Sequence, residues 1–393
     1  MDEVLNLRQT STTRARAQAL LARARAGGSP HFRVDDSAIA GAAQWVAKTT
    51  LARYTNGHIP YHSRWRHFEA GGVGRLAGLN AKLPADKAAR AVAQIDLAVV
   101  SVLLDAGAGA AWSYDEAGQK FTRSEGLGVA SFHGFCAALF SSEAGVLQAD
   151  AAGLQAVTEQ SLGGMFQVND ANPIVGLPGR VSLMNHLGRV LAERADVFAD
   201  AHGVCRPGNL FLKLGQGREV QAHAILDVLL DGLSDVWRTP NHLGGVSLGD
   251  CWPHSAVGWM PFHKLSQWLT YSLLEPFEWA GVAVTGLGAL TGLPEYRNGG
   301  LLLDAGVLRC KNPDAHAKTW AVGDEFIVEW RALTVALLDE IAVFVRQILG
   351  KTEAEMPLAC VLEGGTWAAG RVLAQQLRGG EPPLKLALDG TVF

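Results

Sequence analysis

The chain has 393 residues, of which 48% are hydrophobic and 18% charged, and its net charge is −4. This balance favours a folded protein with a large core over a disordered one. The slight acidity offers no basic patch for nucleic acid, and no apolar run reaches the roughly 18 residues that a membrane helix needs. Neither a nucleic-acid partner nor a membrane partner is therefore expected.

The N-terminus and the cysteines indicate a cellular compartment. Residues 5–26 are rich in Arg and Ala and are expected to form an amphipathic helix, without the apolar core of a signal peptide. The five cysteines are scattered and include no CxxC pair. That pattern is typical of reduced thiols and excludes a cysteine-based zinc site of the usual spacing. Both features predict a cytoplasmic protein.

Helical periodicity recurs along the chain, between loops that are rich in Gly and Pro. The expected helices span 37–52, 86–106, 130–140, 182–195, 221–233, 263–274, 326–349 and 366–377. Strand patterns are few: a hairpin over 112–123 and a short strand over 209–214. GxGxxG and GxxxxGK[ST] are both absent, so a nucleotide-binding α/β domain is not expected. We predict a mainly α fold, with a helical extension over 1–34 and a single large helical domain over 35–393.

The first loop that concentrates polar side chains spans 61–75. Loops on a rigid helical scaffold often carry binding groups. Arg66, His67 and Glu69 are therefore candidate substrate-binding residues. A local ion pair between Arg66 and Glu69 is the structural alternative.

The segment 249–276 carries many candidate residues. Asp250, Trp252 and His254 precede a helix that is expected to stop at Pro276, because proline cannot donate the next backbone hydrogen bond. At helical spacing, one side of this helix carries versatile polar and aromatic groups, which suit a pocket wall better than a solvated face. These are His263, Lys264, Gln267, Tyr271 and Glu275, with Trp268 at the boundary. A buried structural network is the alternative.

Two sets of side chains have the ligand types of a metal site. The first set is His58, His62 and His67, and the second is Asp250, His254 and His263. Neither set has a recognised spacing such as HExxH. The sequence therefore predicts no metal site and no cofactor.

Two stretches near the C-terminus complete the candidate site. Glu295, Tyr296 and Arg297 stand between a proline and a double glycine, where a bent backbone can present opposite charges at one spot. Glu329 and Arg331 open a long apolar helix. For Glu329, a favourable interaction with the helix dipole is the alternative role.

At these motifs the chain resembles the uracil-catabolism protein 4 family. The resemblance rests on RWRHFEAGG (64–72), NPIVGLPGR (172–180), RPG (206–208), LGDCWPH (248–254), PFHKLSQWLTYSLLEP (261–276), LTGLPEYRNGGLLLD (290–304) and VEWRALTVALLDEIA (328–342). It covers the chain from about residue 35 onward. It implies a part in a microbial route that breaks uracil down through a ribosylated intermediate and releases urea.

The order of three motifs is also similar to the queuosine-salvage proteins, which are helical N-glycoside hydrolases with a DNA-glycosylase-like core. The matching residues are Phe262, Lys264 and Gln267, then Leu290, Thr291, Glu295, Tyr296 and Arg297, then Glu329, Arg331, Ala332 and Thr334. Here Glu295 stands where those proteins carry Asp, and His263 where they carry an aromatic residue. This resemblance implies a DNA-glycosylase-like helical core and N-glycoside hydrolysis.

Cleavage of an N-glycosidic bond requires a stabilised oxocarbenium ion, a delivered water and a protonated leaving nitrogen. Glu295 is the first candidate for the carboxylate and Asp250 the second. His263 and His254 are the candidate proton donors, because histidine can supply a proton near neutral pH.

The remaining candidates contact the substrate in two ways. Cationic side chains that can hold a 5′-phosphate through charge-assisted bonds are Lys264, Arg297 and Arg66. Aromatic side chains that can exclude water are Trp252, Trp268 and Tyr271. We therefore expect a hydrolase that releases urea from ribosylurea or its 5′-phosphate. Two alternatives stay open: a metal-dependent amidohydrolase that acts on the ring-opened pyrimidine, and a non-catalytic subunit that binds a pathway intermediate.

Overall fold

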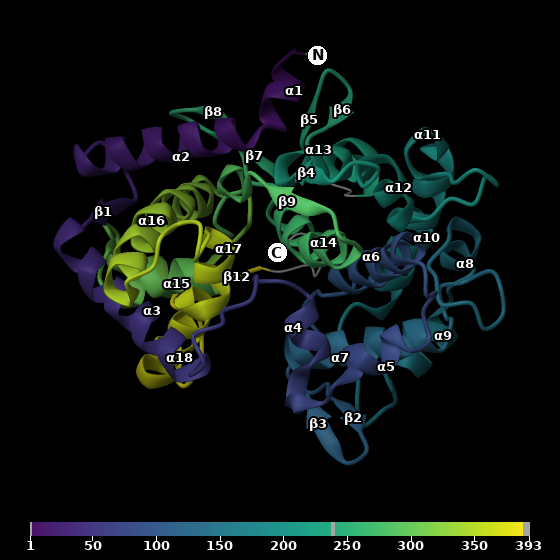
Figure 1. Ribbon diagram of the computed structural model, residues 1–393. Coiled ribbons are helices and arrows are strands. Elements are labelled where there is room, and N and C mark those ends of the chain that lie inside the picture. Colours follow the sequence, from purple (N-terminus) through teal and green to yellow (C-terminus); the bar gives the residue numbers. More distant parts are fainter. Residues whose placement is uncertain (1, 237–239, 388–393) are drawn as a thin grey trace. The chain divides into compact units, whose positions relative to one another are not determined.

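The computed structural model describes residues 2–236 and 240–387 (Figure 1). The fold is predominantly α-helical, as predicted, and the strands within these ranges form only two-stranded pairs. No helix within these ranges combines the length and the apolar composition that crossing a membrane requires. The chain divides into two compact units: unit 1 contains 2–62, 240–268 and 286–387, and unit 2 contains 63–236 and 269–285.

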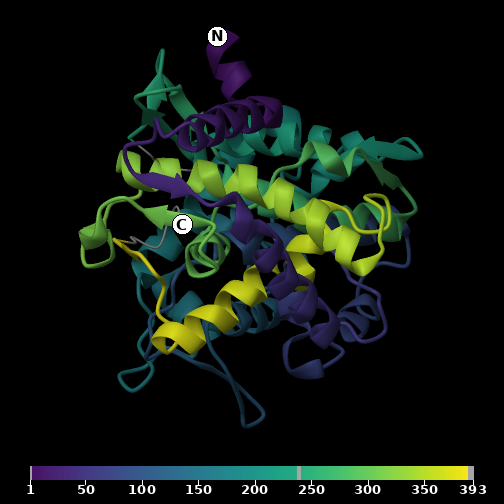
Figure 2. The same cartoon turned by 90° about the vertical axis from the view of Figure 1, so that its left-hand side faces the viewer.

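Unit 1 is organised around one long helix, α16 (Glu325–Leu349). Its side chains from Phe326 to Leu338 are all buried, as expected for a helix with neighbours on several sides. The helices that pack against it are α2 (Thr10–Arg25), α3 (Ile39–Arg53), α15 (Tyr296–Asp304) and α17 (Leu358–Val361). Figure 2 shows the yellow-green α16 beside the purple α2.

The N-terminal helix expected over 5–26 is divided into α1 (Asp2–Leu7) and α2. Arg14 Nε donates to Asp339 Oδ2 at 2.9 Å. Arg25 pairs with Glu340 at 2.7 Å. The N-terminal segment is therefore joined to α16 by ion pairs as well as by packing, within unit 1.

A π-helical turn lies inside the last helix of unit 1. α17, η7 (Leu362–Thr366) and α18 (Trp367–Arg378) follow one another without a break, and η7 is the π-helical turn. Two glycines let α3 approach it closely. A Cβ on Gly365 would lie 2.4 Å from the carbonyl oxygen of Val46, and a Cβ on Gly364 would lie 2.9 Å from Thr50 Oγ1. Such turns are rare and occur frequently at functional sites.

We predict that Gly365→Ala destabilises the protein by about 1–3 kcal/mol, because the added methyl group must displace the backbone of α3. Gly41, near the start of α3, is the matched control, because a Cβ at this residue would meet no atom within 4 Å. Gly41→Ala is expected to be neutral, or stabilising by up to about 1 kcal/mol, because alanine favours the helix. Urea unfolding of both variants checks this. Equal stability of the two variants would contradict the close approach.

The strand pairs of unit 1 join segments that are distant in sequence or form hairpins. β1 (Phe32–Val34) is antiparallel to β10 (Leu308–Cys310), and β11 (Thr319–Trp320) is parallel to β12 (Lys385–Leu386). β5 (His242–Leu243) and β6 (Val246–Ser247) form one hairpin. β7 (Cys251–His254) and β8 (Gly258–Pro261) form another, which leads directly into α14 (Lys264–Ala280).

Unit 2 is a second helical body, built around α6. Its helices are α4 (Trp65–Phe68), α5 (Arg75–Asn80), α6 (Lys87–Leu103), α7 (Arg123–Cys136), α8 (Ala151–Gln155), α9 (Glu159–Met165), α10 (Leu177–Glu193), α11 (Ala195–Phe198), α12 (Leu210–Leu214), α13 (Ala222–Leu233) and the part of α14 after residue 268. Side chains of α6 from Ala91 to Leu103 are all buried. The expected hairpin is present as β2 (Tyr114–Glu116) and β3 (Gln119–Phe121). β4 (Glu219–Gln221) pairs in parallel with β9 (Ala283–Thr285).

The strand expected over 209–214 is wrong, because this segment is the helix α12. The turn η3 (Pro207–Asn209) starts it. Asp96 on α6 accepts the backbone N–H of Gly208 at 2.8 Å and the guanidinium of Arg206 at 2.5 Å. This buried carboxylate fixes the turn from outside the segment, so local sequence alone did not reveal the helix.

The expected end of a helix at Pro276 is also wrong, because α14 continues to Ala280. Proline lacks the N–H that would bond the carbonyl of Ser272, four residues earlier. In the structure the indole N–H of Trp65 donates to that carbonyl at 2.8 Å. The side chain of Trp65 thus replaces the missing donor, and the helix continues past the proline.

Candidate active site

Glu295 is the N-cap residue of α15 in unit 1. Its Oε1 accepts the backbone N–H of Asn298 at 2.5 Å, and its Oε2 accepts that of Arg297 at 2.7 Å. Burial raises the pKa of Glu295, whereas these N–H groups and the charges of Lys264 and His62 lower it, and the net shift is upward. A carboxylate with a raised pKa beside cationic groups is suited to accept a proton during catalysis.

Asp250 holds the elements of this site together. Arg331 on α16 binds it with both terminal nitrogens, Nη1 to Oδ1 at 2.8 Å and Nη2 to Oδ2 at 2.7 Å. The indole of Trp252 donates to Oδ1 at 2.8 Å, and the backbone N–H of Lys264 donates to Oδ2 at 3.0 Å. Arg331 Nε also donates to the carbonyl of Pro294, the residue before Glu295, at 3.2 Å.

These contacts give Asp250 a structural role. Burial raises its pKa, but Arg331, the Lys264 N–H and Trp252 together lower it to about 2. Four donors already surround its two oxygens. Glu295 is therefore the better candidate for a catalytic base, while Asp250 positions the start of α14 and the residue before Glu295.

We predict that Asp250→Asn lowers the free energy of unfolding by about 3–5 kcal/mol at pH 7, because the change leaves the Arg331 guanidinium buried without its anion. Asp196→Asn in the exposed pair with Arg194 is the control, and it is expected to change stability far less, because exposed ion pairs contribute little. Urea unfolding measures both.

The ion pair between Asp250 and Arg331 also makes the stability of the protein depend on pH in the acid range. The pKa of Asp250 is lowered from 3.8 to about 2 on folding, so its contribution is fully present above pH 4 and disappears as the pH falls toward 2. Its size is about 2 kcal/mol. Between pH 4 and pH 2 the Asp250→Asn variant should therefore lose less stability than the wild type. Parallel pH profiles would contradict this.

The two histidines predicted as proton donors have other contacts. His263 has a left-handed φ of 47°, and its ring Nε2 bonds the carbonyl of Leu7 at 2.9 Å. Burial lowers the pKa of His263. His254 Nδ1 accepts the backbone N–H of Ala256 at 3.1 Å, so its Nε2 carries the proton and lies 3.6 Å from Glu329 Oε2. His254 and Glu329 thus form a buried pair in unit 1.

The other predicted residues of unit 1 contact segments near Glu295 in the sequence or the ring of His62. Gln267 Oε1 accepts the backbone N–H of Thr291 at 3.3 Å. The ring of Trp268 lies 6.4 Å from that of His62. Arg297 lies over the ring of Tyr296 and donates from Nη1 to the carbonyl of Gly380 at 3.0 Å.

Arg297 is a buried cation without an anionic partner in the described part of the chain. Arg297 is only 5% exposed, and its Nε has no hydrogen-bond partner. No Asp or Glu within 2–236 and 240–387 forms an ion pair with it. A buried guanidinium in this state is costly unless a ligand supplies the negative charge.

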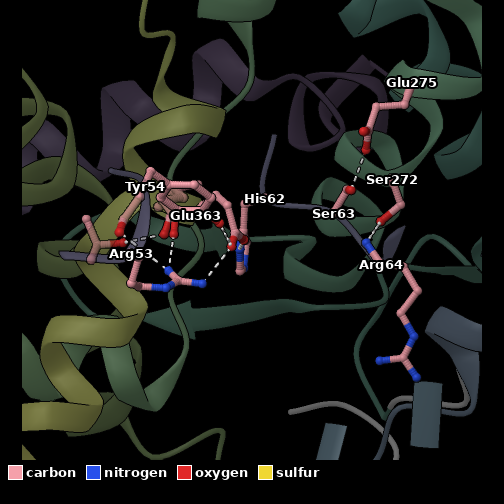
Figure 3. A network of polar contacts seen from close by, with 11 residues as sticks. Arg53, Tyr54, His62, Ser63, Arg64, Ser272, Glu275 and Glu363 are labelled. Atoms are coloured by element: carbon pink, nitrogen blue, oxygen red, sulfur yellow. Dashed lines mark hydrogen bonds and ion pairs between the residues drawn. The ribbon is translucent and has the colours of Figure 1, made fainter. Parts of the chain in front are cut away.

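The structure places five predicted residues in unit 2: Arg66, His67, Glu69, Tyr271 and Glu275. Arg66 pairs with Glu275 at 2.5 Å, and Ser63 donates to the other oxygen of Glu275 at 2.6 Å (Figure 3). Glu69 accepts the backbone N–H of Leu76 at 2.8 Å. The partner of Arg66 is therefore Glu275, and the local pair with Glu69 is not formed.

Sequence reasoning missed Glu363, which lies in the π-helical turn η7. Its Oε1 accepts Tyr54 Oη at 2.6 Å and Arg53 Nη2 at 2.9 Å, and its Oε2 bonds His62 Nδ1 at 2.8 Å. Figure 3 shows the three side chains directed at this carboxylate. Burial raises the pKa of Glu363, but His62, Arg53 and Tyr54 together lower it to about 2.

A signal for this residue was present in the sequence. The tripeptide Glu363-Gly364-Gly365 stands inside an apolar helical pattern. Paired glycines in such a pattern indicate a close approach of another backbone. The helix expected over 366–377 begins just after this tripeptide and therefore does not include Glu363.

The two sets of possible metal ligands do not come together as sites. No group of three or more His, Cys, Asp or Glu side chains in the described part of the chain is arranged to hold a metal ion. From the first set, His62 binds Glu363. From the second set, Asp250 binds Arg331.

Comparison with known proteins places this arrangement in a family. Residues 6–393 match the family model described as "Protein of unknown function (DUF1688)". The chain is 38% identical to "Protein urg3" of Schizosaccharomyces pombe, over 100% of this chain and 99% of that protein. It is 34% identical to "Uracil catabolism protein 4" of Lachancea kluyveri, over 93% of each.

The chain belongs to the DUF1688 family, which includes uracil catabolism protein 4. The resemblance inferred from the motifs is thereby confirmed. Both relatives align along essentially the whole chain, so the segments that carry Glu295, Asp250 and Glu363 all lie within the shared length.

Proposed function

We propose that this protein acts in uracil catabolism and hydrolyses the N-glycosidic bond of ribosylurea or of its 5′-phosphate, releasing urea. The name of the Lachancea kluyveri relative supports the pathway. The motif order shared with the queuosine-salvage hydrolases supports the type of bond. The observation that carries the proposal is the Glu295 carboxylate, whose pKa burial raises although Lys264 and His62 lie within electrostatic reach.

The carboxylate has two tasks in this reaction. As the bond between the sugar and nitrogen breaks, positive charge develops on the sugar, and an anion nearby stabilises it. The same oxygen then accepts a proton from the attacking water. The backbone N–H groups of Arg297 and Asn298 hold the carboxylate in place, so the group does not have to reorganise during the reaction.

We predict that Glu295→Gln lowers the rate of urea release by at least about 100-fold, because it removes charge and basicity but keeps the shape. Glu295→Asp keeps the charge and a preferred N-cap group, so it should retain more activity. The loss of a helix cap is controlled by Asp86→Ala, which removes the side-chain N-cap of α6 in unit 2. Urea release from both ribosylureas is the assay. Full activity of a folded Glu295→Gln protein would contradict the proposal.

The cations suggest where a 5′-phosphate would bind. Lys264 opens α14 beside the Asp250 contact, and Arg297 follows Glu295. Because Arg297 has no anionic partner among the described residues, a phosphate would supply the charge that the protein lacks there.

We predict that Arg297→Met and Lys264→Met each weaken binding of the phosphorylated substrate by about 10- to 100-fold, the value of one charge-assisted hydrogen bond. Binding of the unphosphorylated ribosylurea should change much less, which makes that compound the internal control. Calorimetric titration of the inactive Glu295→Gln protein, with and without each second change, measures both affinities. Equal weakening for the two compounds would rule out a phosphate site.

A further inference from the structure

We propose that His62 is the proton donor to the leaving nitrogen, and that Glu363 in the π-helical turn is the residue that positions it. This inference rests on the proposed hydrolysis and adds the acid that the reaction needs. Of the two histidines predicted from the sequence, His263 bonds the carbonyl of Leu7 through Nε2, and His254 Nε2 faces the buried Glu329 at 3.6 Å without a hydrogen bond to it.

The backbone and the ring of His62 are both fixed to one helix. Its backbone N–H donates to the carbonyl of Ala359 in α17 at 3.0 Å. Its ring Nδ1 lies 2.8 Å from Glu363 Oε2, one turn later in η7. Because an ionised carboxylate can only accept hydrogen bonds, Nδ1 must carry a proton. Glu363 therefore sets both the orientation of the ring and its tautomer. The aspartate of a catalytic triad orients its histidine in the same way.

The second ring nitrogen of His62, Nε2, is available to a substrate. His62 Nε2 has no hydrogen-bond partner within 2–236 and 240–387. The side chain is 14% exposed, so the ring is accessible, and the indole of Trp268 flanks it. The charge on His62 also lowers the pKa of Glu295, which places this ring and the proposed base within electrostatic reach of each other.

Two carboxylates act on the ring of His62. Glu363 binds Nδ1, and Glu295 acts on the ring from α15. Arg53 and Tyr54 at the end of α3 bind the other oxygen of Glu363 and keep it ionised. Lys264 is the other cation that acts on Glu295.

The proposed step breaks the bond between C1′ and nitrogen. The electron pair of that bond stays with the nitrogen, which takes the proton from Nε2 of the imidazolium. Water adds to C1′ and gives one proton to the Glu295 carboxylate. Urea leaves neutral, ribose or its 5-phosphate forms, and transfer of the proton from Glu295 back to His62 restores both groups. No oxidant or cofactor takes part.

The test compares leaving groups that do and do not need an acid. Urea needs a proton to depart, whereas nicotinamide riboside carries a cationic ring that departs as a neutral molecule without one. We expect His62→Gln to lower urea release from ribosylurea by at least about 100-fold, and cleavage of nicotinamide riboside by less than about 5-fold, within the range of an indirect effect of the change. Glu295→Gln should lower both. His58→Gln, an exposed histidine in the same loop, is the matched control and should lower neither.

A pH profile separates positioning from mere structure. Glu363→Gln removes the negative charge beside Nδ1, so the alkaline limb of kcat/KM for ribosylurea should move to lower pH, and thermal unfolding checks that the fold is kept. Two results would overturn the proposal while the proposed function stands: wild-type urea release by His62→Gln, or an equal loss on both leaving groups. If the wild-type protein releases no urea from ribosylurea or its phosphate, the proposed function itself fails.

Discussion

The ion pair between Asp250 and Arg331 is the interaction on which the rest of unit 1 depends. Its two partners come from the turn before β7 and from the buried middle of α16. The same two side chains also bind the first N–H of α14 and the carbonyl of Pro294. One buried pair thus sets the positions of Lys264 and Glu295, although neither residue contributes to it through its side chain. Such pairs are poor stabilisers in comparison with apolar packing, but they specify one arrangement.

The second constraint is the close approach of α3 to the π-helical turn. The glycines in η7 remove the Cβ atoms that would keep the two backbones apart. The end of α3 then supplies Arg53 and Tyr54 to Glu363, and the loop that follows supplies His62. Glu363 in the π-helical turn lies toward the end of α3. The backbone irregularity and the polar network are therefore two aspects of one contact.

The sequence predicted the parts of the fold that depend on local patterns. The helices α6, α10, α13 and α16 follow from periodicity alone, and the hairpin β2–β3 follows from its turn residues. The failures at 209–214 and at Pro276 share one cause. In each, a side chain distant in the sequence, Asp96 or Trp65, satisfies a backbone group that local rules leave without a partner.

The candidate site shows the same limit. Motif order identified Glu295, Asp250 and Lys264, because these residues lie in long and distinctive segments. Motif order did not distinguish Asp250, whose carboxylate is fully hydrogen-bonded, from Glu295, whose pKa is raised. That difference comes from Arg331, which lies on another helix and binds only Asp250. The role of Glu363 could not be predicted from the sequence, because its partners lie about 300 positions earlier in the chain.

The hydrogen bond between Trp65 and the carbonyl of Ser272 also has a consequence for how the family evolves. The hydrogen bond from this indole is needed only while residue 276 is proline, since any other residue would restore the helical N–H and compete for the same carbonyl. Positions 65 and 276 are more than two hundred residues apart in the chain, yet they should be exchanged together during evolution. Paired substitution at these two positions would record a hydrogen bond that neither position reveals by itself.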